Sequence, residues 1–186
     1  MVVDNFIESN HSIKMVSGPT KSGKSRWAEH LLTDNRDVIC IATGPLLEND
    51  QSWQERIEAH RDQRPNHWST IECEGDLCMA MSSISTYVPV LIDSLGGVVA
   101  RYLDDTNEEW STHQDQVIKA LVHHQAEVVV VVEETGWGVV PSTTIGGLFR
   151  ERLGILSQKV SNLANECWLV MQGRAINIME WGVHVP

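Results

Sequence analysis

Short runs of apolar, mostly β-branched residues recur along the chain, and longer amphipathic or polar stretches separate them. Within each run the apolar positions are continuous and do not alternate with polar ones. Such runs are typical of strands that are buried on both faces, as in a parallel sheet covered by helices. The predicted strands span 13–17, 38–42, 88–92, 128–132 and 167–171, and 175–181 is predicted as a final strand that closes a hairpin.

The stretches between these runs have the spacing of helices. Predicted helices span 25–32, 51–61, 113–125 and 148–165, and the third ends at His123 and His124, which we expect to be solvated. The alternation of strands and helices predicts an α/β fold of three layers with right-handed crossovers, a mostly parallel sheet and an antiparallel C-terminal edge. We expect a single domain over 1–186, with a flexible leader over about 1–11.

Ligands in an open α/β sheet bind at the carboxyl ends of the strands. The residues that follow the predicted strands are therefore the first candidates for a site. Gly18, Thr43, Asp93 and Glu134 stand at or just beyond these positions. Because parallel strands end at the same edge of a sheet, the sequence predicts that these residues face one site.

The segment after the first predicted strand matches the phosphate-binding pattern G-x-x-x-x-G-K-[ST] in full, and a helical segment follows it. Its glycines let the backbone approach a phosphate closely, and the N–H groups of the loop point at phosphate oxygens. We expect Lys24 to be catalytic by neutralising the β- and γ-phosphates, and Ser25 to bind Mg²⁺. The predicted nucleotide-binding residues of this P-loop are Gly18, Pro19, Thr20, Lys21, Ser22, Gly23, Lys24 and Ser25.

A P-loop also needs an acid at a neighbouring strand end, which holds the Mg²⁺ ion, often through water. Asp93 fits this role, and Glu134, which follows a run of valines, is the alternative candidate. An acid at the boundary between a strand and a turn also occurs in proteins without any such role. The sequence alone leaves these interpretations open.

Composition limits the partners that this chain can have. The formal net charge of −11 argues against a nucleic-acid or anionic-membrane partner, since either needs a basic face. It does not argue against a nucleotide, which a P-loop holds with backbone N–H groups, one lysine and a metal ion. No run approaches the ~20 apolar residues that span a bilayer, so we expect no transmembrane segment. Cysteines without metal-binding spacing favour a reduced, cytoplasmic setting.

The one basic cluster of this acidic chain spans 56–68 and contains His60, Arg61 and Arg64. It follows a helical segment, and the macrodipole of a helix favours cations at its C-terminus, so a solvated helix end is one interpretation. The other is a second phosphate site, in which the arginines grip phosphate oxygens and His60 acts as a nucleophile or general base. Composition does not decide between the two.

Several segments, taken in order, resemble one enzyme family. They are the first strand with GPTKSGKSRWAEHLL, then VICIATG, ERIEAHRDQRPNHWSTIE, VLIDSL, EETGWGVVP and FRERLGILSQKVSNLANECWLVMQG. Through them the chain, from Ile13 onward, resembles the bifunctional adenosylcobinamide kinase and adenosylcobinamide-phosphate guanylyltransferase family of cobalamin biosynthesis. The segments ERIEAHRDQRP and ETGWGVVP are far more specific to this family than the P-loop is.

The resemblance implies a reaction sequence. Members of the family phosphorylate the aminopropanol hydroxyl of adenosylcobinamide with ATP or GTP. They then transfer GMP from GTP onto that phosphate through a GMP-histidine intermediate, releasing pyrophosphate. The resemblance also implies a RecA-like P-loop fold and a small homo-oligomer, often a trimer.

The resemblance implies functional residues as well. The nucleophile of the GMP transfer corresponds to His60. The expected nucleotide contacts outside the P-loop are Thr43, Gly44, Pro45, Arg61, Asp62, Gln63, Arg64, Glu72 and Asp93.

The chain departs from the usual family pattern after Asp93, where it reads DSLGGVVARYL. Ser94 stands in place of a cysteine, Gly96 of a threonine and Arg101 of an asparagine, while Glu133 replaces another asparagine. Gly96 and Arg101 fall where the corrinoid or a neighbouring subunit is expected to pack. Two alternatives therefore stay open, namely a corrinoid kinase with a single activity and a non-catalytic nucleotide-binding relative.

Overall fold

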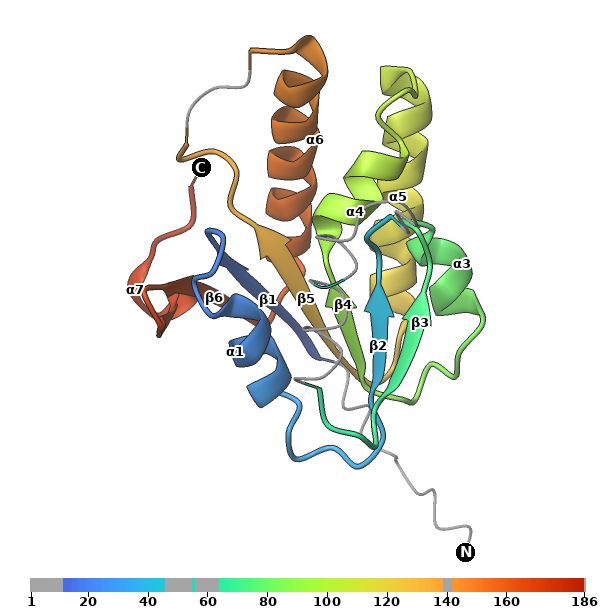
Figure 1. The fold of residues 1–186 in the computed structure, drawn as a ribbon, viewed down its shortest axis with the longest axis vertical. Coiled ribbons are helices and arrows are strands. Elements are labelled where there is room, and N and C mark those ends of the chain that lie inside the picture. The colour runs from blue at the N-terminus through green and yellow to red at the C-terminus, as the bar shows by residue number, and fades with distance from the viewer. Residues whose placement is uncertain (1–11, 46–54, 56–63, 139–141, 186) are drawn as a thin grey trace, which may run out of the picture.

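The computed structural model describes residues 12–45, 55, 64–138 and 142–185. In this part of the chain, seven strands form one sheet in the order β3-β2-β4-β5-β1-β6-β7 (Figure 1). Neighbouring strands are parallel except for β6 and β7, which form an antiparallel hairpin at one edge. The prediction of a mostly parallel sheet with an antiparallel C-terminal edge is therefore confirmed.

The strands are short and the helices cover both faces of the sheet. The strands are β1 (Ser12–Gly18), β2 (Ile39–Ala42), β3 (Ser69–Glu72), β4 (Val90–Asp93), β5 (Glu127–Glu133), β6 (Glu166–Met171) and β7 (Arg174–Asn177). The helices are α1 (Lys24–His30), α3 (Leu77–Ser82), α4 (Leu95–Arg101), α5 (Asn107–His123), α6 (Thr144–Ser161) and α7 (Ile178–Trp181). Within the described ranges, none of the helices is both long enough and apolar enough to cross a membrane.

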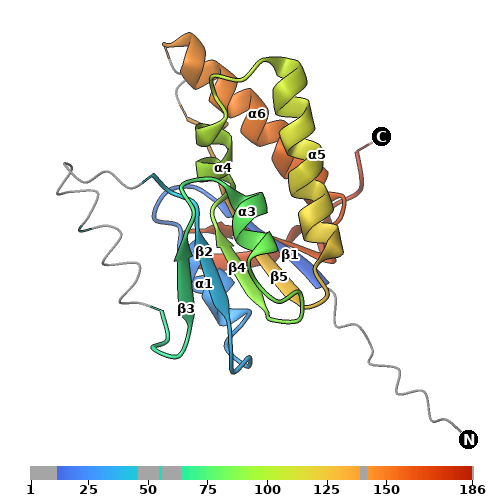
Figure 2. The same cartoon turned by 90° about the vertical axis from the view of Figure 1, so that its right-hand side faces the viewer.

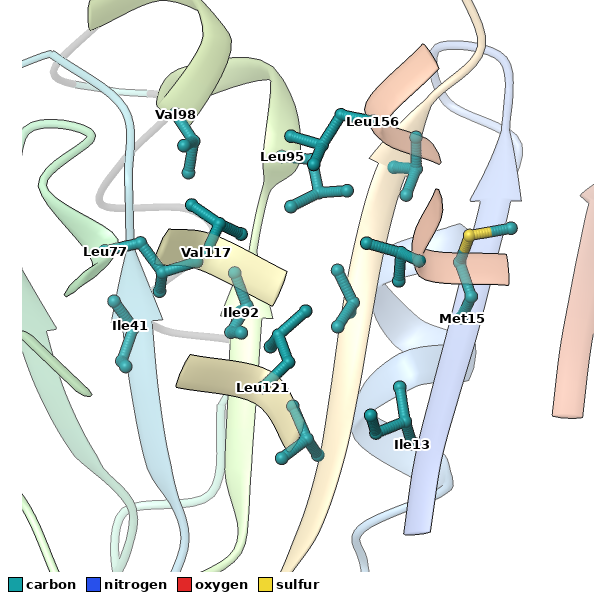
Figure 3. Close-up of a cluster of buried hydrophobic side chains, with 14 of the residues drawn as sticks. Ile13, Met15, Ile41, Leu77, Ile92, Leu95, Val98, Val117, Leu121 and Leu156 are labelled. Carbon is teal, nitrogen blue, oxygen red and sulfur yellow. The ribbon is translucent and has the colours of Figure 1, made fainter. Parts of the chain in front are cut away.

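Each face of the sheet carries its own apolar cluster, which explains why the strand sequences do not alternate. On β5, Val128, Val130 and Val132 belong to the larger cluster, whereas Val129 and Val131 belong to the smaller one. The larger cluster packs against α3, α4, α5 and α6, and Figure 3 shows part of it. The smaller cluster packs against α1 on the opposite face (Figure 2). These layers confirm the predicted three-layer α/β arrangement.

The predicted final strand at 175–181 is wrong in its second half. β7 ends at Asn177, and α7 begins at the next residue. The side-chain oxygen of Asn177 accepts a hydrogen bond from the Met179 N–H at 3.2 Å, which is the bond that an N-cap residue makes. The strand therefore ends at this cap, although apolar residues continue beyond it.

Two helices begin earlier than predicted. Their first turns have few apolar residues, so the hydrophobic spacing did not indicate where they start. α5 begins at Asn107, where Thr106 and Glu109 form a reciprocal capping box. α6 begins at Thr144, and the Thr143 hydroxyl caps it by accepting a hydrogen bond from the Gly146 N–H. The short elements β3, α3 and α4 were not predicted. The predicted helix at 51–61 lies outside the described residues, apart from position 55.

His124 is buried, so the expectation that it would be solvated is wrong. Only 1% of its surface is exposed. Its ring nitrogen Nε2 lies 2.8 Å from the carbonyl oxygen of Val88. The histidine therefore joins the end of α5 to the segment that leads into β4, and it is part of the scaffold.

Candidate nucleotide-binding site

The P-loop connects β1 to α1 at the carboxyl end of the sheet (Figure 1). Gly23, the residue before α1, has a φ of +100°, a left-handed conformation that glycine adopts without steric cost. The Lys24 Nζ atom lies 3.4 Å from the carbonyl oxygen of Pro19 and donates a hydrogen bond to it. The lysine side chain thus reaches back across the loop that is expected to surround the phosphates.

The hairpin of β6 and β7 supports the P-loop. The Gly173 N–H donates a hydrogen bond to the Ser22 carbonyl oxygen at 3.0 Å. A Cβ atom on Gly18 would lie 2.3 Å from the carbonyl oxygen of Val170. The Ser22 hydroxyl is buried and has no hydrogen-bond partner among the described residues. An orphaned buried polar group of this kind is consistent with a ligand that completes the loop.

Replacing Gly18 by alanine is expected to destabilise the protein by about 1–3 kcal/mol, because the added methyl group forces the backbone of β6 to move. A urea unfolding curve measures this loss. Gly147→Ala is the matched control, since a Cβ atom at Gly147 meets nothing within 4 Å. If the two variants have the same free energy of unfolding, the close packing at Gly18 does not contribute to stability.

Asp93 lies at the end of β4 and is paired with Arg64. The Arg64 Nη2 atom is 3.3 Å from Asp93 Oδ2, and the two side chains are only 8% and 18% exposed. The Nη1 atom of Arg64 also donates to the Thr70 hydroxyl at 3.5 Å. Asp93 was predicted from the P-loop chemistry and Arg64 from the basic segment. The structure shows that these two residues are direct partners.

Glu29 adds a carboxylate that the sequence analysis did not identify. It lies on α1 one helical turn beyond Ser25, so the two residues share a helix face. Burial raises the pKa of Glu29 from 4.5 to about 7, against the opposing effect of the Arg64 charge, while the negative charge of Asp93 raises it further. These couplings place Glu29 in the same electrostatic environment as the Arg64–Asp93 pair. The four-residue spacing between Ser25 and Glu29 was the feature of the sequence that could have identified Glu29 as a site residue.

The raised pKa of Glu29 makes stability depend on pH. The folded protein retains a proton that the unfolded chain releases, so this contribution is complete below pH 4.5 and is lost as the pH rises through about 7. We therefore expect Glu29→Gln to unfold at a higher urea concentration than wild type at about pH 8, with the difference much smaller at about pH 5.

The measurement is made in EDTA so that no metal ion contributes. Glu151→Gln is the matched control, because Glu151 is an exposed residue on α6. A Glu29→Gln variant that is no more stable than wild type at the higher pH would refute the raised pKa.

Thr43 follows β2 and is 1% exposed. Its hydroxyl accepts a hydrogen bond from the Ser94 N–H at 2.9 Å and donates one to the Ser94 carbonyl oxygen at 2.5 Å. Thr43 was predicted to contact a nucleotide, but its hydroxyl group is engaged by the segment after β4. Gly44 and Pro45 follow Thr43 at this edge, and Glu72 ends β3 beside it.

The side chains of Glu133 and Glu134, which follow the valine run, contact different parts of the protein. Glu134 faces its own turn, where its Oε1 atom accepts a hydrogen bond from the Gly136 N–H at 2.5 Å. The carboxylate of Glu133 instead accepts hydrogen bonds from the Ser94 hydroxyl and the Gly96 N–H. Glu133, which sequence reasoning noted only as a departure from a family pattern, is therefore the acid that contacts the segment after β4.

Two departures noted in the sequence have structural roles. Gly96 is buried at the start of α4, so it does not present a surface to a substrate or subunit. Arg101 donates a hydrogen bond from Nη1 to the Glu74 carbonyl oxygen at 3.2 Å, and its Nη2 atom lies 3.5 Å from Asp76 Oδ2. Arg101 therefore joins α4 to the turn before α3. His60, Arg61, Asp62 and Gln63 lie outside the described residues.

The donor atoms of the site suit Mg²⁺. Ser25 offers a hydroxyl and Asp93 a carboxylate, and Mg²⁺ prefers oxygen ligands while keeping several waters and taking phosphate oxygens. Across the part of the chain that the structure describes, no group of three or more His, Cys, Asp or Glu side chains is placed to hold a metal ion. The Ser25 hydroxyl and the Asp93 carboxylate are of the donor type that Mg²⁺ prefers, and water and phosphate oxygens can supply its other ligands.

A P-loop between β1 and α1, an acid at the end of β4 and a mostly parallel sheet define a P-loop nucleotide-binding protein of RecA-like fold. The fold is shared with a solved ATPase from the type III secretion system of pathogenic bacteria. The TM-score is 0.59 at 8% identity, over 94% of this chain and 59% of that chain.

Within this class, residues 14–178 match the cobinamide kinase / cobinamide phosphate guanyltransferase family, and the chain belongs to that family of transferases. It is 32% identical over 185 residues to the bifunctional adenosylcobalamin biosynthesis protein CobU of Escherichia coli (strain K12), covering 88% of this chain and 98% of that protein. The related CobP of Pseudomonas aeruginosa is 24% identical over 172 residues, which cover 86% and 92% of the two chains. The family resemblance drawn from the sequence is confirmed.

Proposed function

We propose that this chain phosphorylates adenosylcobinamide with ATP or GTP and then transfers GMP from GTP onto the new phosphate, giving adenosylcobinamide-GDP and pyrophosphate. The observation that carries the proposal is the family match over 14–178, in a chain whose P-loop sequence matches the full pattern and connects β1 to α1. The relatives from Escherichia coli and Salmonella typhimurium are named as bifunctional enzymes of adenosylcobalamin biosynthesis.

In the kinase step, the aminopropanol hydroxyl of the corrinoid attacks the γ-phosphorus. The bond to the β–γ bridging oxygen breaks, the nucleoside diphosphate leaves, and the hydroxyl proton is released. Lys24 neutralises charge that develops on the transferred group, and the N–H groups of the P-loop hold the phosphates. Ser25 and Asp93 would hold a Mg²⁺ ion, which would supply further charge neutralisation.

In the transfer step, the His60 imidazole attacks the α-phosphorus of GTP. Pyrophosphate leaves, and a phosphoramidate bond joins GMP to the histidine. The phosphate of the corrinoid then attacks the same phosphorus and releases the free imidazole. Arg61, Asp62, Gln63 and Arg64 follow His60 in the sequence, and we propose that this segment contacts the nucleotide, together with Gly44, Pro45 and Glu72.

We further propose that the protein is cytoplasmic and forms a homo-oligomer, with a trimer as the expected size. Exposed apolar side chains on β7, on α7 and beyond them support an association between copies, because isolated soluble chains seldom expose such a group. They are Ile176, Ile178, Met179, Trp181, Val183 and Val185. Light scattering tests the proposal, which fails if the mass in solution equals the 20.8 kDa of one chain.

The deciding experiment incubates the purified protein with adenosylcobinamide, Mg²⁺ and either ATP alone or ATP with GTP. Mass spectrometry of the corrinoid is expected to show the phosphate in the first case and the GDP adduct in the second. Intact-protein mass spectrometry after GTP alone is expected to show an added GMP. Phosphorylation without either GMP product selects a single-activity corrinoid kinase. Nucleotide binding without any corrinoid product selects a non-catalytic relative.

A further inference from the structure

Ser94, the residue directly after Asp93, is held through every one of its polar groups. Its N–H donates to the Thr43 hydroxyl at 2.9 Å, and its carbonyl oxygen accepts from the same hydroxyl at 2.5 Å. Its own hydroxyl donates to the Glu133 carboxylate. Ser94 is 7% exposed, so water does not compete for these bonds. A buried polar group that is fully bonded is fixed in one position.

Thr43 extends this hold to Asp93 itself. The Thr43 N–H donates to the Asp93 carbonyl oxygen at 3.0 Å, which continues the pairing of β2 with β4 beyond the end of β2. One threonine therefore binds three consecutive backbone groups, namely the carbonyl of Asp93 and both the N–H and the carbonyl of Ser94. The position of the Asp93 main chain depends on this residue.

Glu133 holds Ser94 from the other side. It ends β5, the strand that lies between β1 and β4 in the sheet. One carboxylate oxygen accepts the Ser94 hydroxyl, and the other, Oε2, accepts the Gly96 N–H at 3.0 Å. Two donors on one carboxylate fix its orientation. Glu133 thus bridges the strand beside the P-loop to the segment after Asp93.

Two adjacent glycines make this arrangement possible. A Cβ atom on Gly96 would lie 2.6 Å from the Glu133 Oε2 atom, and one on Gly97 would lie 2.3 Å from the Thr43 hydroxyl oxygen. Glycine within a helix costs about 1 kcal/mol relative to alanine, and both glycines lie in α4. The missing side chains let α4 begin directly against Thr43 and Glu133.

We infer that Thr43 and Glu133 are positioning residues: they fix Ser94, and through it they hold Asp93 where its carboxylate meets the metal ion of the bound nucleotide. The inference rests on the proposed role of Asp93 in holding Mg²⁺. It assigns to Thr43 the role of holding the backbone at Asp93 and Ser94. The other four residues, Glu133, Ser94, Gly96 and Gly97, serve the same positioning. Partners that orient a metal-binding group commonly change metal affinity by about 10–100-fold when they are lost.

The test measures how much Mg²⁺ strengthens ATP binding, by calorimetric titration of the full chain with ATP in Mg²⁺ and in EDTA. Ser94→Ala and Glu133→Ala are expected to reduce this Mg²⁺-dependent gain about tenfold, with the affinity in EDTA less affected. Glu133→Gln is expected to retain most of the gain, because its amide oxygen can accept the Gly96 N–H while its amide nitrogen donates to Ser94. A role that is only structural would lower both affinities together.

Two further variants keep the outcomes distinct. Ser157→Ala removes a helical hydroxyl that donates to the Leu153 carbonyl oxygen at 2.6 Å, and it controls for the loss of a serine elsewhere. Asp93→Asn tests the proposed metal role directly. If Asp93→Asn loses the Mg²⁺-dependent gain while Ser94→Ala and Glu133→Ala keep it, the positioning inference fails and the proposed function stands. If Asp93→Asn keeps the Mg²⁺-dependent gain, Asp93 does not hold Mg²⁺, and the positioning inference that rests on this role fails with it.

Discussion

Lys24→Ala is expected to slow phosphorylation of the corrinoid by about a hundredfold to a thousandfold, the loss seen when one preorganised charge or donor is removed from a transition state. Lys24 is placed for this role because it begins α1 and its Nζ atom crosses the P-loop to the Pro19 carbonyl oxygen at 3.4 Å. An ammonium group held inside the loop needs little movement to meet a γ-phosphate. The measurement is the rate of corrinoid phosphate formation at saturating ATP.

Lys119→Ala is the matched control for this variant, because Lys119 is exposed on α5. We expect it to have the wild-type rate. Equal unfolding midpoints for the two variants ensure that the loss is not one of folding. A Lys24→Ala rate within a few-fold of wild type would mean that the kinase step takes place elsewhere on the protein.

His60→Ala is expected to abolish the acid-labile GMP adduct completely, because an alanine has no atom that can attack the α-phosphorus. The variant should still phosphorylate the corrinoid, since the P-loop carries out that step. Labelled GTP followed by denaturation and filtration measures the adduct, and corrinoid mass spectrometry measures the kinase product in the same sample.

His67→Ala provides the comparison, because His67 is an exposed histidine within the same basic segment, 56–68. It is expected to keep the wild-type amount of adduct. If His60→Ala retains the label and His67→Ala loses it, the nucleophile has been assigned to the wrong histidine. If both variants lose the kinase product as well, the two steps are not separable in the way proposed.

The sequence was most informative where one short pattern determines both local structure and chemistry. The P-loop pattern predicted a strand and a helix start, which the structure confirms. It also predicted a phosphate site, because its glycines, lysine and serine have fixed places in that turn. The valine run predicted β5 because a strand that is buried on both faces has no polar positions. Family resemblance was visible because long specific segments, such as ETGWGVVP, persist along the chain.

The contacts within the site were less predictable, because they join residues that are distant in sequence. Nothing in the local pattern pairs Arg64 with Asp93 or points Glu133 at Ser94. The two glycines of α4 made that segment a poor helix candidate, and only the sheet geometry shows why the side chains are missing. Burial of Glu29, which shifts its pKa, likewise depends on how α1 packs onto the sheet.

The order of strands in the sheet has a consequence for synthesis on the ribosome. β1 is the first strand among the described residues, yet its neighbours are β5 and β6, and its residue Gly18 is in register with Glu133. In a growing polypeptide, this apolar strand therefore has no neighbouring strand until β5 has emerged. Contacts of such long sequence separation form slowly and leave a nascent chain open to aggregation. The P-loop is therefore synthesised well before β5, β6 and the Gly173 N–H group that contact β1 and the loop.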